Sequence, residues 1–297
     1  MSLVKSPGGV ALYANCALLT DVKLIYSSRC LKVAPLPIGM DIARMVNTNN
    51  KIAPHPVLSD YYRSEADRRE RVDEMFDSSA EHYDWINSVM SFGSGQWYRQ
   101  QALSRVGFAP GMRVLDAGAG TGVVSWLQQQ MVGDDGLVVA LDPSSGMLSE
   151  AKKRGVQRVT QGLGEKLPFA DDVFDRVTMS YALRHVADLQ ALFDEFLRVL
   201  KPGGKLLILE ITKPQSRFGC WLLNAYMKGL VPTITRVFRR SIEAQTLMRY
   251  YWDTIEKCVP PATILQTIRS AGFEQPGRDV VFGTFSEYRA RKPERRS

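Results

Sequence analysis

The most informative part of this sequence is Val114-Leu115-Asp116-Ala117-Gly118-Ala119-Gly120-Thr121-Gly122, which joins an apolar run to an amphipathic one. Residues 113–116 are typical of a short buried strand, and residues 123–131 of a helix. The three glycines let the backbone turn sharply between them and approach a bound ligand closely. The first amides of the helix favour a negatively charged group in front of the loop. This stretch therefore predicts a strand–loop–helix unit that holds a ligand at its glycine loop.

The alternation of strand and helix continues after this unit. Further strands are expected at 137–142, 156–160, 174–180 and 205–210, with helices at 144–154 and 189–200. The run at 137–142 is continuously apolar, as parallel strands covered on both faces are. A helix at 262–271 and two paired strands within 280–290 complete the pattern. Repeated units of this kind predict an α/β fold with a doubly wound, mostly parallel sheet.

The regions around this core divide the chain into residues 1–60, 61–292 and 293–297. Residues 1–39 hold a single acid and show no clear period. They are an organelle targeting segment, a poorly ordered tail, or sequence upstream of a start at Met40 or Met45. Residues 46–60, rich in Asn and Pro, are expected to form a linker. Residues 61–292 are expected to fold as one domain, followed by a solvated basic tail at 293–297.

Two helical windows flank the strands. Residues 75–100 have aromatic side chains on helical spacing, which pack into a core, form a lid over the active site, or do both. Residues 211–242 hold six Lys and Arg and no acid, interleaved with apolar residues. This second window is either a helix pair with solvated cations or an inserted lid whose apolar and basic faces rest on an anionic bilayer.

Charge, hydropathy and cysteine spacing limit the partners, membrane spans and metal sites that this chain can have. The net charge of +7 favours an anionic partner, such as a membrane surface, nucleic acid or an acidic cofactor. No run of about 18 apolar residues exists, so no transmembrane helix is expected. The four cysteines, Cys16, Cys30, Cys220 and Cys258, include no C-x-x-C pair, so we expect no metal site. Scattered thiols are typical of a reducing compartment.

The spacing of the glycine loop distinguishes between cofactors. A nicotinamide site has a Gly or Ala three residues after its second glycine, whereas Val123 stands there in this chain. Asp116, before the first glycine, suits a cofactor with an amino-acid end rather than a pyrophosphate. Asp142 ends the next strand, where an acid accepts hydrogen bonds from ribose hydroxyls. Its alternative role is to cap the helix that starts near Ser144.

Together the pieces resemble the class I methyltransferases, and within them the ubiquinone/menaquinone biosynthesis C-methyltransferase family. The resemblance covers about residues 72–292 and rests on MFDSSAEHYDWINSVMSFG, GEKLPFADDVFDRVTMSYALRHV, FLRVLKPGGKLLILEITKP and MRYYWDTI. It implies a Rossmann-like, seven-stranded sheet with N-terminal helices and an inserted helical lid. It also implies S-adenosylmethionine as cofactor and a ring carbon of a prenylated benzoquinol or naphthoquinol as methyl acceptor.

The resemblance also implies positions for the cofactor. The glycine loop and Asp142 are expected to hold it, with Leu163 and Gly164 beside the adenine and Ser180 beside the methionine part. The full expected set is Asp116, Gly118, Gly120, Thr121, Gly122, Asp142, Pro143, Met147, Leu163, Gly164 and Ser180. Two positions depart from the family, which has an acid at Val123 and an Asp or Asn at Leu163. A side-chain bond to the adenine amine is then lost, or Glu165 or the backbone supplies it.

Ring methylation requires an electron-rich, deprotonated phenol. Arg184 is a candidate to stabilise the phenolate and His185 to take the proton, with Tyr83, His82 and Glu210 as further candidates. The family has Arg-Asn where this chain has Arg184-His185. Alternatively, Arg184 forms a salt bridge at the surface and His185 caps a turn.

Three functions compete at this point: methylation of a prenylated quinol, methylation of another small apolar acceptor, and a non-catalytic cofactor-binding subunit of a quinone-synthesis complex. A nucleic-acid substrate is disfavoured, because the basic residues alternate with large apolar ones. We expect a cytoplasmic protein that contacts the inner membrane peripherally, or a mitochondrial or plastid one if residues 1–39 target it. Formation of a homodimer is left open.

Overall fold

The computed structural model describes residues 51–91, 94–214, 216–226, 229 and 242–295, which belong to one compact unit. The predictions made for residues 1–50, and for the basic residues Lys228, Arg236, Arg239 and Arg240, lie outside the described residues. No helix in the described ranges is long and apolar enough to cross a membrane.

A seven-stranded sheet forms the centre of the fold. Its strands are β1 (Arg113–Ala117), β2 (Leu137–Asp142), β3 (Arg158–Gln161), β4 (Phe174–Ser180), β5 (Leu200–Ile211), β6 (Glu274–Val281) and β7 (Phe285–Arg291). Their order is β3-β2-β1-β4-β5-β7-β6. The first five are parallel, whereas β7 runs antiparallel to β5 and β6 antiparallel to β7. The predicted doubly wound, mostly parallel sheet is confirmed.

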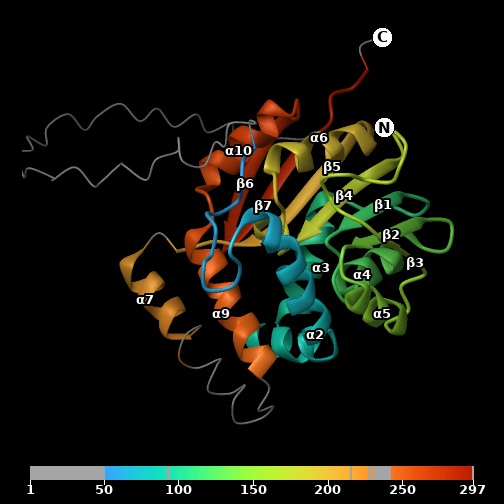
Figure 1. The fold of residues 1–297 in the computed structure, drawn as a ribbon. Helices are drawn as coiled ribbons and strands as arrows, with labels where there is room; N and C mark the ends of the chain where they lie inside the picture. Colours follow the sequence, from blue (N-terminus) through green and yellow to red (C-terminus); the bar gives the residue numbers. More distant parts are fainter. Residues whose placement is uncertain (1–50, 92–93, 215, 227–228, 230–241, 296–297) are drawn as a thin grey trace, which may run out of the picture. The chain divides into compact units, whose positions relative to one another are not determined.

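Helices cover both faces of this sheet (Figure 1). One face carries α3 (Gly95–Val106), α4 (Val123–Val132) and α5 (Ser145–Lys153), and the other α6 (Leu189–Val199) and α10 (Pro261–Ser270). Adjacent strand residues alternate between them: Val114 and Leu207 pack toward α3 and α4, and Leu115 and Leu206 toward α6 and α10. Both sets are fully buried, which explains the continuous apolar runs of the strands.

The aromatic-rich N-terminal segment forms α2 (Glu65–Ser91), a single helix of 27 residues that precedes α3. It packs against α5 and against α9 (Ile242–Lys257). Val72 of α2 shares an apolar cluster with Leu58, Met248 and Tyr250. Phe76, Tyr83 and Trp85 are half-buried against this cluster, so the core role predicted for them is confirmed. The side chain of Met90 lies outside the described residues.

Residues 51–60 differ from the linker that their composition predicted. The Ile52 carbonyl accepts the Leu189 amide at 2.9 Å, and the Pro54 carbonyl accepts the Val259 amide at 2.7 Å. Asp188 accepts the Ile52 amide in return. Because both carbonyls satisfy amides at the starts of α6 and α10, this segment is a packed strap.

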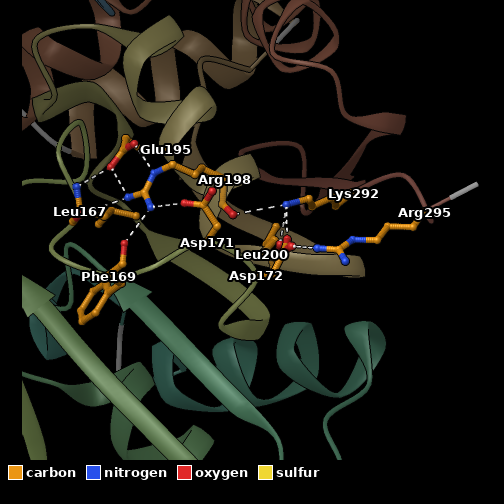
Figure 2. Close-up of polar contacts among 9 residues, drawn as sticks. All are labelled: Leu167, Phe169, Asp171, Asp172, Glu195, Arg198, Leu200, Lys292 and Arg295. Atoms are coloured by element: carbon orange, nitrogen blue, oxygen red, sulfur yellow. Dashed lines mark hydrogen bonds and ion pairs between the residues drawn. The ribbon is translucent and has the colours of Figure 1, made fainter.

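Lys292 and Arg295 both pair with Asp172, and the side chain of Arg295, in the expected basic tail, is 79% exposed. The Lys292 ammonium donates to Asp172 and to the Leu200 carbonyl, both at 2.7 Å, and Arg295 donates to Asp172 at 2.6 Å (Figure 2). In the same view Arg198 of α6 donates to Glu195 and Asp171. Residues 292 and 295 thus contact the loop between β3 and β4.

Candidate functional site

The strand order reverses between β1 and β4, and a cavity of about 400 Å³ lies at the carboxyl ends of these strands. This is where ligands bind in open α/β sheets, and the volume is within the range of small-molecule sites, roughly 300–1,000 Å³. The glycine loop, the ends of β2 and β4, and α2 supply its walls. Of the residues predicted to bind the cofactor, those that line the cavity are Gly118, Gly120, Asp142, Pro143, Met147, Leu163, Gly164 and Ser180.

Two positions of the glycine loop leave no room for a side chain. Gly118 has a φ of +66°, and a Cβ there would lie 2.5 Å from the Cβ of Ala182. Gly122 has a φ of +75°, and a Cβ there would collide with Val156 and Ala151 of the adjacent unit. Gly118 therefore shapes the cavity wall, whereas Gly122 sets the packing of the loop against α5 and does not line the cavity.

Asp116 lies behind the loop rather than in the cavity. Its carboxylate accepts hydrogen bonds from Ser125 of α4 at 2.6 Å and Thr178 of β4 at 2.9 Å. Burial raises the pKa of Asp116 to about 6. Any effect of Asp116 on the cofactor is therefore transmitted through the loop that it anchors.

Asp142 stands at the cavity wall, as predicted. Its two carboxylate oxygens accept the amide of Gly120 at 2.8 Å and the amide of Ser144 at 2.9 Å. Burial raises its pKa to about 6, although these two hydrogen bonds lower it. The alternative role as helix cap belongs to Ser144, whose hydroxyl accepts the Met147 amide. Asp142 is thus held with its remaining lone pairs available for ligand hydroxyls.

The carboxyl end of β4 contributes a polar residue, Ser180, to the cavity wall. The Ser180 hydroxyl is buried, lines the cavity and has no hydrogen-bond partner among the described residues. Leu163 and Gly164 also line the cavity, and Leu163 pairs with Lys166 in a tight turn. Glu165 lines the cavity as well, and one of its oxygens accepts the Ala187 amide at 2.6 Å. Its carboxylate is therefore fixed in position beside Leu163.

Two acids of α2 fasten this helix across the glycine loop, and sequence reasoning missed both. Asp77 accepts the Gly146 amide at the start of α5 at 2.9 Å. Asp84, one heptad later on the same helix, accepts the Thr121 hydroxyl at 2.6 Å and pairs with Arg154. Thr121 was expected to contact the cofactor, but its hydroxyl is directed to α2 and it does not line the cavity. The seven-residue spacing of the two acids was the available signal.

Aromatic side chains line a further part of the cavity, which we call its aromatic end. Phe76 and Tyr83 of α2 line it together with Tyr181 and His185. The His185 ring packs edge-on against Phe76, with centroids 5.2 Å apart, and stacks on Tyr250 at 5.3 Å. Burial lowers the pKa of His185 well below its usual value, with Arg184 acting in the same direction. His185 is therefore neutral, and this end of the cavity is flat-walled and largely apolar.

Arg184 lies behind the aromatic wall and does not line the cavity. Its guanidinium pairs with Glu210, donates to Thr254 at 3.1 Å and lies over the Tyr251 ring at 5.2 Å from the centroid. Both members of the ion pair are buried, which differs from the surface salt bridge considered as the alternative. We therefore assign Arg184 and Glu210 a positioning role. The side chain of His82 lies outside the described residues.

Comparison with known proteins identifies the family. The model of the ubiE/COQ5 methyltransferase family matches residues 64–288. The chain belongs to this family. A demethylmenaquinone methyltransferase of Corynebacterium glutamicum is 35% identical over 224 residues, which cover 75% of this chain and 94% of that protein.

Solved structures show the same fold. A SAM-dependent methyltransferase from Aquifex aeolicus aligns with a TM-score of 0.51 at 20% identity, over 70% of this chain and 97% of that one. A phosphoethanolamine N-methyltransferase of Haemonchus contortus, solved with S-adenosyl-L-methionine, aligns with a TM-score of 0.54 at 18% identity, over 73% of this chain and 57% of that one. Fold and family together make this chain an S-adenosylmethionine-dependent methyltransferase.

The residues present fit this cofactor. Asp142 offers a carboxylate to ribose hydroxyls, and the buried Ser180 hydroxyl offers a donor and an acceptor with no internal use. Met147 and Leu163 offer apolar surface for an adenine ring. Among the described residues no group of His, Cys, Asp or Glu is arranged to hold a metal ion.

Proposed function

We propose that this methyltransferase methylates a ring carbon of a prenylated quinol, with a naphthoquinol favoured over a benzoquinol. The observation that carries the proposal is the flat aromatic end of the cavity, formed by Phe76, Tyr83 and His185 beside the cofactor end. The naphthoquinol is favoured because the 35% identical relative is a demethylmenaquinone methyltransferase.

The cofactor, when bound, supplies a methyl group already activated on a sulfonium. The chain therefore has to place a nucleophilic ring carbon in line with that group, which accounts for much of the rate of such reactions. We expect Asp142, Ser180 and Gly118 to fix the cofactor, because they line the end of the cavity below the glycine loop. The remaining aromatic walls would hold the acceptor ring.

The side chains around the aromatic end provide the acceptor's polar contacts. The Tyr83 ring lies beside the glycine loop, 4.0 Å from the position of a Cβ at Gly120. The His185 side chain lines the cavity, and its buried Nε2 has no partner among the described residues. We expect these two groups to contact a ring oxygen of the quinol. Arg184 contributes by holding the turn that carries His185.

We further propose that the chain reaches its lipid-linked acceptor by resting on an anionic membrane through α7 (Arg217–Ala225). Phe218, Trp221 and Leu222 of this helix are 71%, 64% and 53% exposed. The Phe218 and Trp221 rings stack at 6.1 Å. Arg217 is exposed beside them, in a window that contains no acid. Exposed aromatic residues with basic neighbours are typical of interfacial helices.

The acceptor is tested directly with purified protein. Demethylated menaquinol and ubiquinol precursors are reduced, mixed with S-adenosylmethionine and analysed by mass spectrometry. A gain of one methyl group on the naphthoquinol ring carbon supports the proposal. Transfer to neither quinol, while another small acceptor is methylated, refutes it. In the source organism, a deletion strain should accumulate the demethylated quinone, and a normal quinone profile would contradict the proposal.

The membrane contact is tested by sedimentation with vesicles that contain phosphatidylglycerol. The wild type should bind at low salt, and the double substitution Phe218→Ser, Trp221→Ser should release it. Phe282→Ser is the matched control, because Phe282 is 74% exposed but lies at the tip of the β6–β7 hairpin. Equal sedimentation of the double variant and the wild type would refute the assignment to α7.

A further inference from the structure

A chain of hydrogen bonds runs from the packed strap to the aromatic end of the cavity, and its direction is determined by its first members. Nδ1 of the buried His55 lies 2.8 Å from the Pro56 carbonyl. A carbonyl only accepts, so Nδ1 carries the proton. Burial lowers the pKa of His55 to about 4, so the ring is neutral near pH 7 and Nε2 is an acceptor. Arg68 donates to this Nε2 at 3.1 Å.

Arg68 continues the chain because a guanidinium has donors and no acceptor. It donates to the Arg184 carbonyl at 3.2 Å, and it also interacts with the Tyr250 hydroxyl. Burial raises the pKa of Tyr250, so the phenol keeps its proton. With Arg68 donating to its oxygen, the phenol must direct its own proton toward an acceptor.

Nδ1 of His185 is that acceptor, 3.1 Å from the Tyr250 oxygen. The His185 ring is neutral because it is buried and because Arg184, His55 and Arg68 all disfavour a second proton. A neutral imidazole has one N–H. If Nδ1 accepts from Tyr250, the N–H is at Nε2, a buried atom without a partner among the described residues, on a side chain that lines the cavity.

We propose that Tyr250 fixes His185 as the Nε2–H tautomer, so that His185 is a hydrogen-bond donor to the acceptor's ring oxygen and not the base that deprotonates it. The second half of this proposal rests on the proposed function. A neutral donor at this place stabilises the negative charge of the ring oxygen while the ring carbon acts as nucleophile. Tyr250 is then a positioning residue that acts through His185.

The tautomer is measured on the free enzyme, without cofactor or acceptor. Long-range ¹H–¹⁵N spectra of protein labelled in the histidine rings distinguish Nδ1–H, Nε2–H and imidazolium forms. His55, His82 and His185 are assigned by single His→Gln variants of each. We expect Nε2–H for His185 and Nδ1–H for His55 in one spectrum near neutral pH. A His185 signal of the Nδ1–H or imidazolium form overturns the proposal whatever the acceptor is.

The role of Tyr250 is tested in the same spectra with Tyr250→Phe. This variant should shift His185 toward the Nδ1–H tautomer or a mixture of tautomers, because the donor to Nδ1 is gone. Tyr61→Phe is the matched control: its hydroxyl bonds to Asp253 at 2.8 Å, and its ring packs edge-on against Tyr250. An unchanged His185 tautomer in Tyr250→Phe overturns the assignment of Tyr250.

Kinetics separate donor from base. Removing a donor aimed at developing negative charge lowers kcat by roughly 10²–10³-fold, which is the loss expected for His185→Ala. His185→Asn and His185→Gln keep an N–H donor but have no basic nitrogen. At least one of them should retain turnover within about tenfold of the wild type, with unchanged cofactor Kd. If both lose as much as His185→Ala while remaining folded, His185 acts as a base.

Discussion

The affinity for S-adenosylmethionine should decrease in mild acid because of Asp142. The carboxylate of Asp142 is fixed by the amides of Gly120 and Ser144 and lines the cavity. Its pKa is raised by burial to about 6. Ribose hydroxyls donate to the ionised carboxylate more strongly than to the neutral acid. Binding therefore requires the form that predominates above about pH 6 and is lost below it.

The size of the effect follows from that pKa. One pH unit below it, roughly a tenth of the carboxyls are ionised, so the affinity should be about tenfold lower at about pH 5 than at about pH 7.5. Replacing Asp142 with Asn removes the charge and leaves an amide nitrogen facing a backbone donor. Hydrogen bonds to a charged group contribute about 1.5–3 kcal/mol, so Asp142→Asn should weaken binding by roughly ten- to a hundredfold and remove the pH dependence.

Isothermal titration calorimetry across this pH range measures both effects, and Asp116→Asn is the matched control. Asp116 is equally buried and its pKa is also raised to about 6, but it does not line the cavity. This variant should keep the pH dependence of binding. A wild-type Kd that stays constant from about pH 5 to 7.5, or an Asp142→Asn variant that keeps the wild-type slope, would refute the assignment of Asp142 to the ribose.

Three further predictions follow from the same structure. First, Arg184→Met leaves the Glu210 carboxylate buried alone, which costs about 3–5 kcal/mol. Urea unfolding should show this loss, with partial recovery when Glu210→Gln is added; a midpoint equal to that of the wild type would contradict the buried pair. Second, Leu163→Asp should tighten cofactor binding by roughly two- to tenfold, because it adds about one hydrogen bond at the adenine wall. Unchanged or weaker binding in calorimetry would show that Glu165 or the backbone already fills that role. Third, Arg198→Ala removes donors to Asp171, Glu195 and two loop carbonyls (Figure 2), and should lower the unfolding free energy by about 1–2 kcal/mol. Arg71→Ala, which breaks the exposed pair of Arg71 and Glu74, is the control. It should lower the unfolding free energy by less than Arg198→Ala does, and equal losses would contradict the prediction.

Lowering the pH should increase the stability of the free protein but decrease its affinity for the cofactor. The pKa values of Asp116 and Asp142 are raised by burial above those of the unfolded chain. The stability that the neutral forms contribute is therefore complete below about pH 4 and is lost as the pH rises through about 6. Cofactor affinity increases over the same interval. An ionised, buried Asp142 therefore lowers the stability of the free protein while it favours cofactor binding.

The sequence was sufficient for the parts of the fold that depend on local patterns. The apolar runs and the glycine loop predicted β1 to β5. The pair expected around Gly283 predicted the hairpin and β7, but β6 begins at Glu274, six residues before the expected start. Gly118, Gly120 and Asp142 were found because a turn and a strand end fix their positions relative to the sheet. These residues lie close to one another in the fold because parallel strands end at one edge.

Contacts between segments far apart in the sequence were not predictable in this way. The strap around Pro54 resembles a linker in composition, yet its carbonyls satisfy amides more than a hundred residues away. Thr121 sits in the glycine loop, but Asp84 of α2 takes its hydroxyl. Arg184 follows β4 as the family pattern requires, but only the packing of β5 and α9 shows that Glu210 and Thr254 hold it behind the cavity wall.

Charged groups in and behind the cavity bear on the charges of the reaction that we propose. Asp142 and Asp73 line the cavity close to each other, and their carboxylates would favour a cationic cofactor. Arg68 lines the cavity and Arg184 lies behind its aromatic wall, near the groups that we propose for the acceptor. Because Arg184 is paired with Glu210, its charge is largely balanced. In our proposal Arg68 acts through neutral groups, His55, Tyr250 and His185, which would orient an N–H toward the acceptor. The quinolate would then be stabilised by an oriented dipole, and a neutral His185 suits that role better than an imidazolium, which would repel the cationic cofactor beside it.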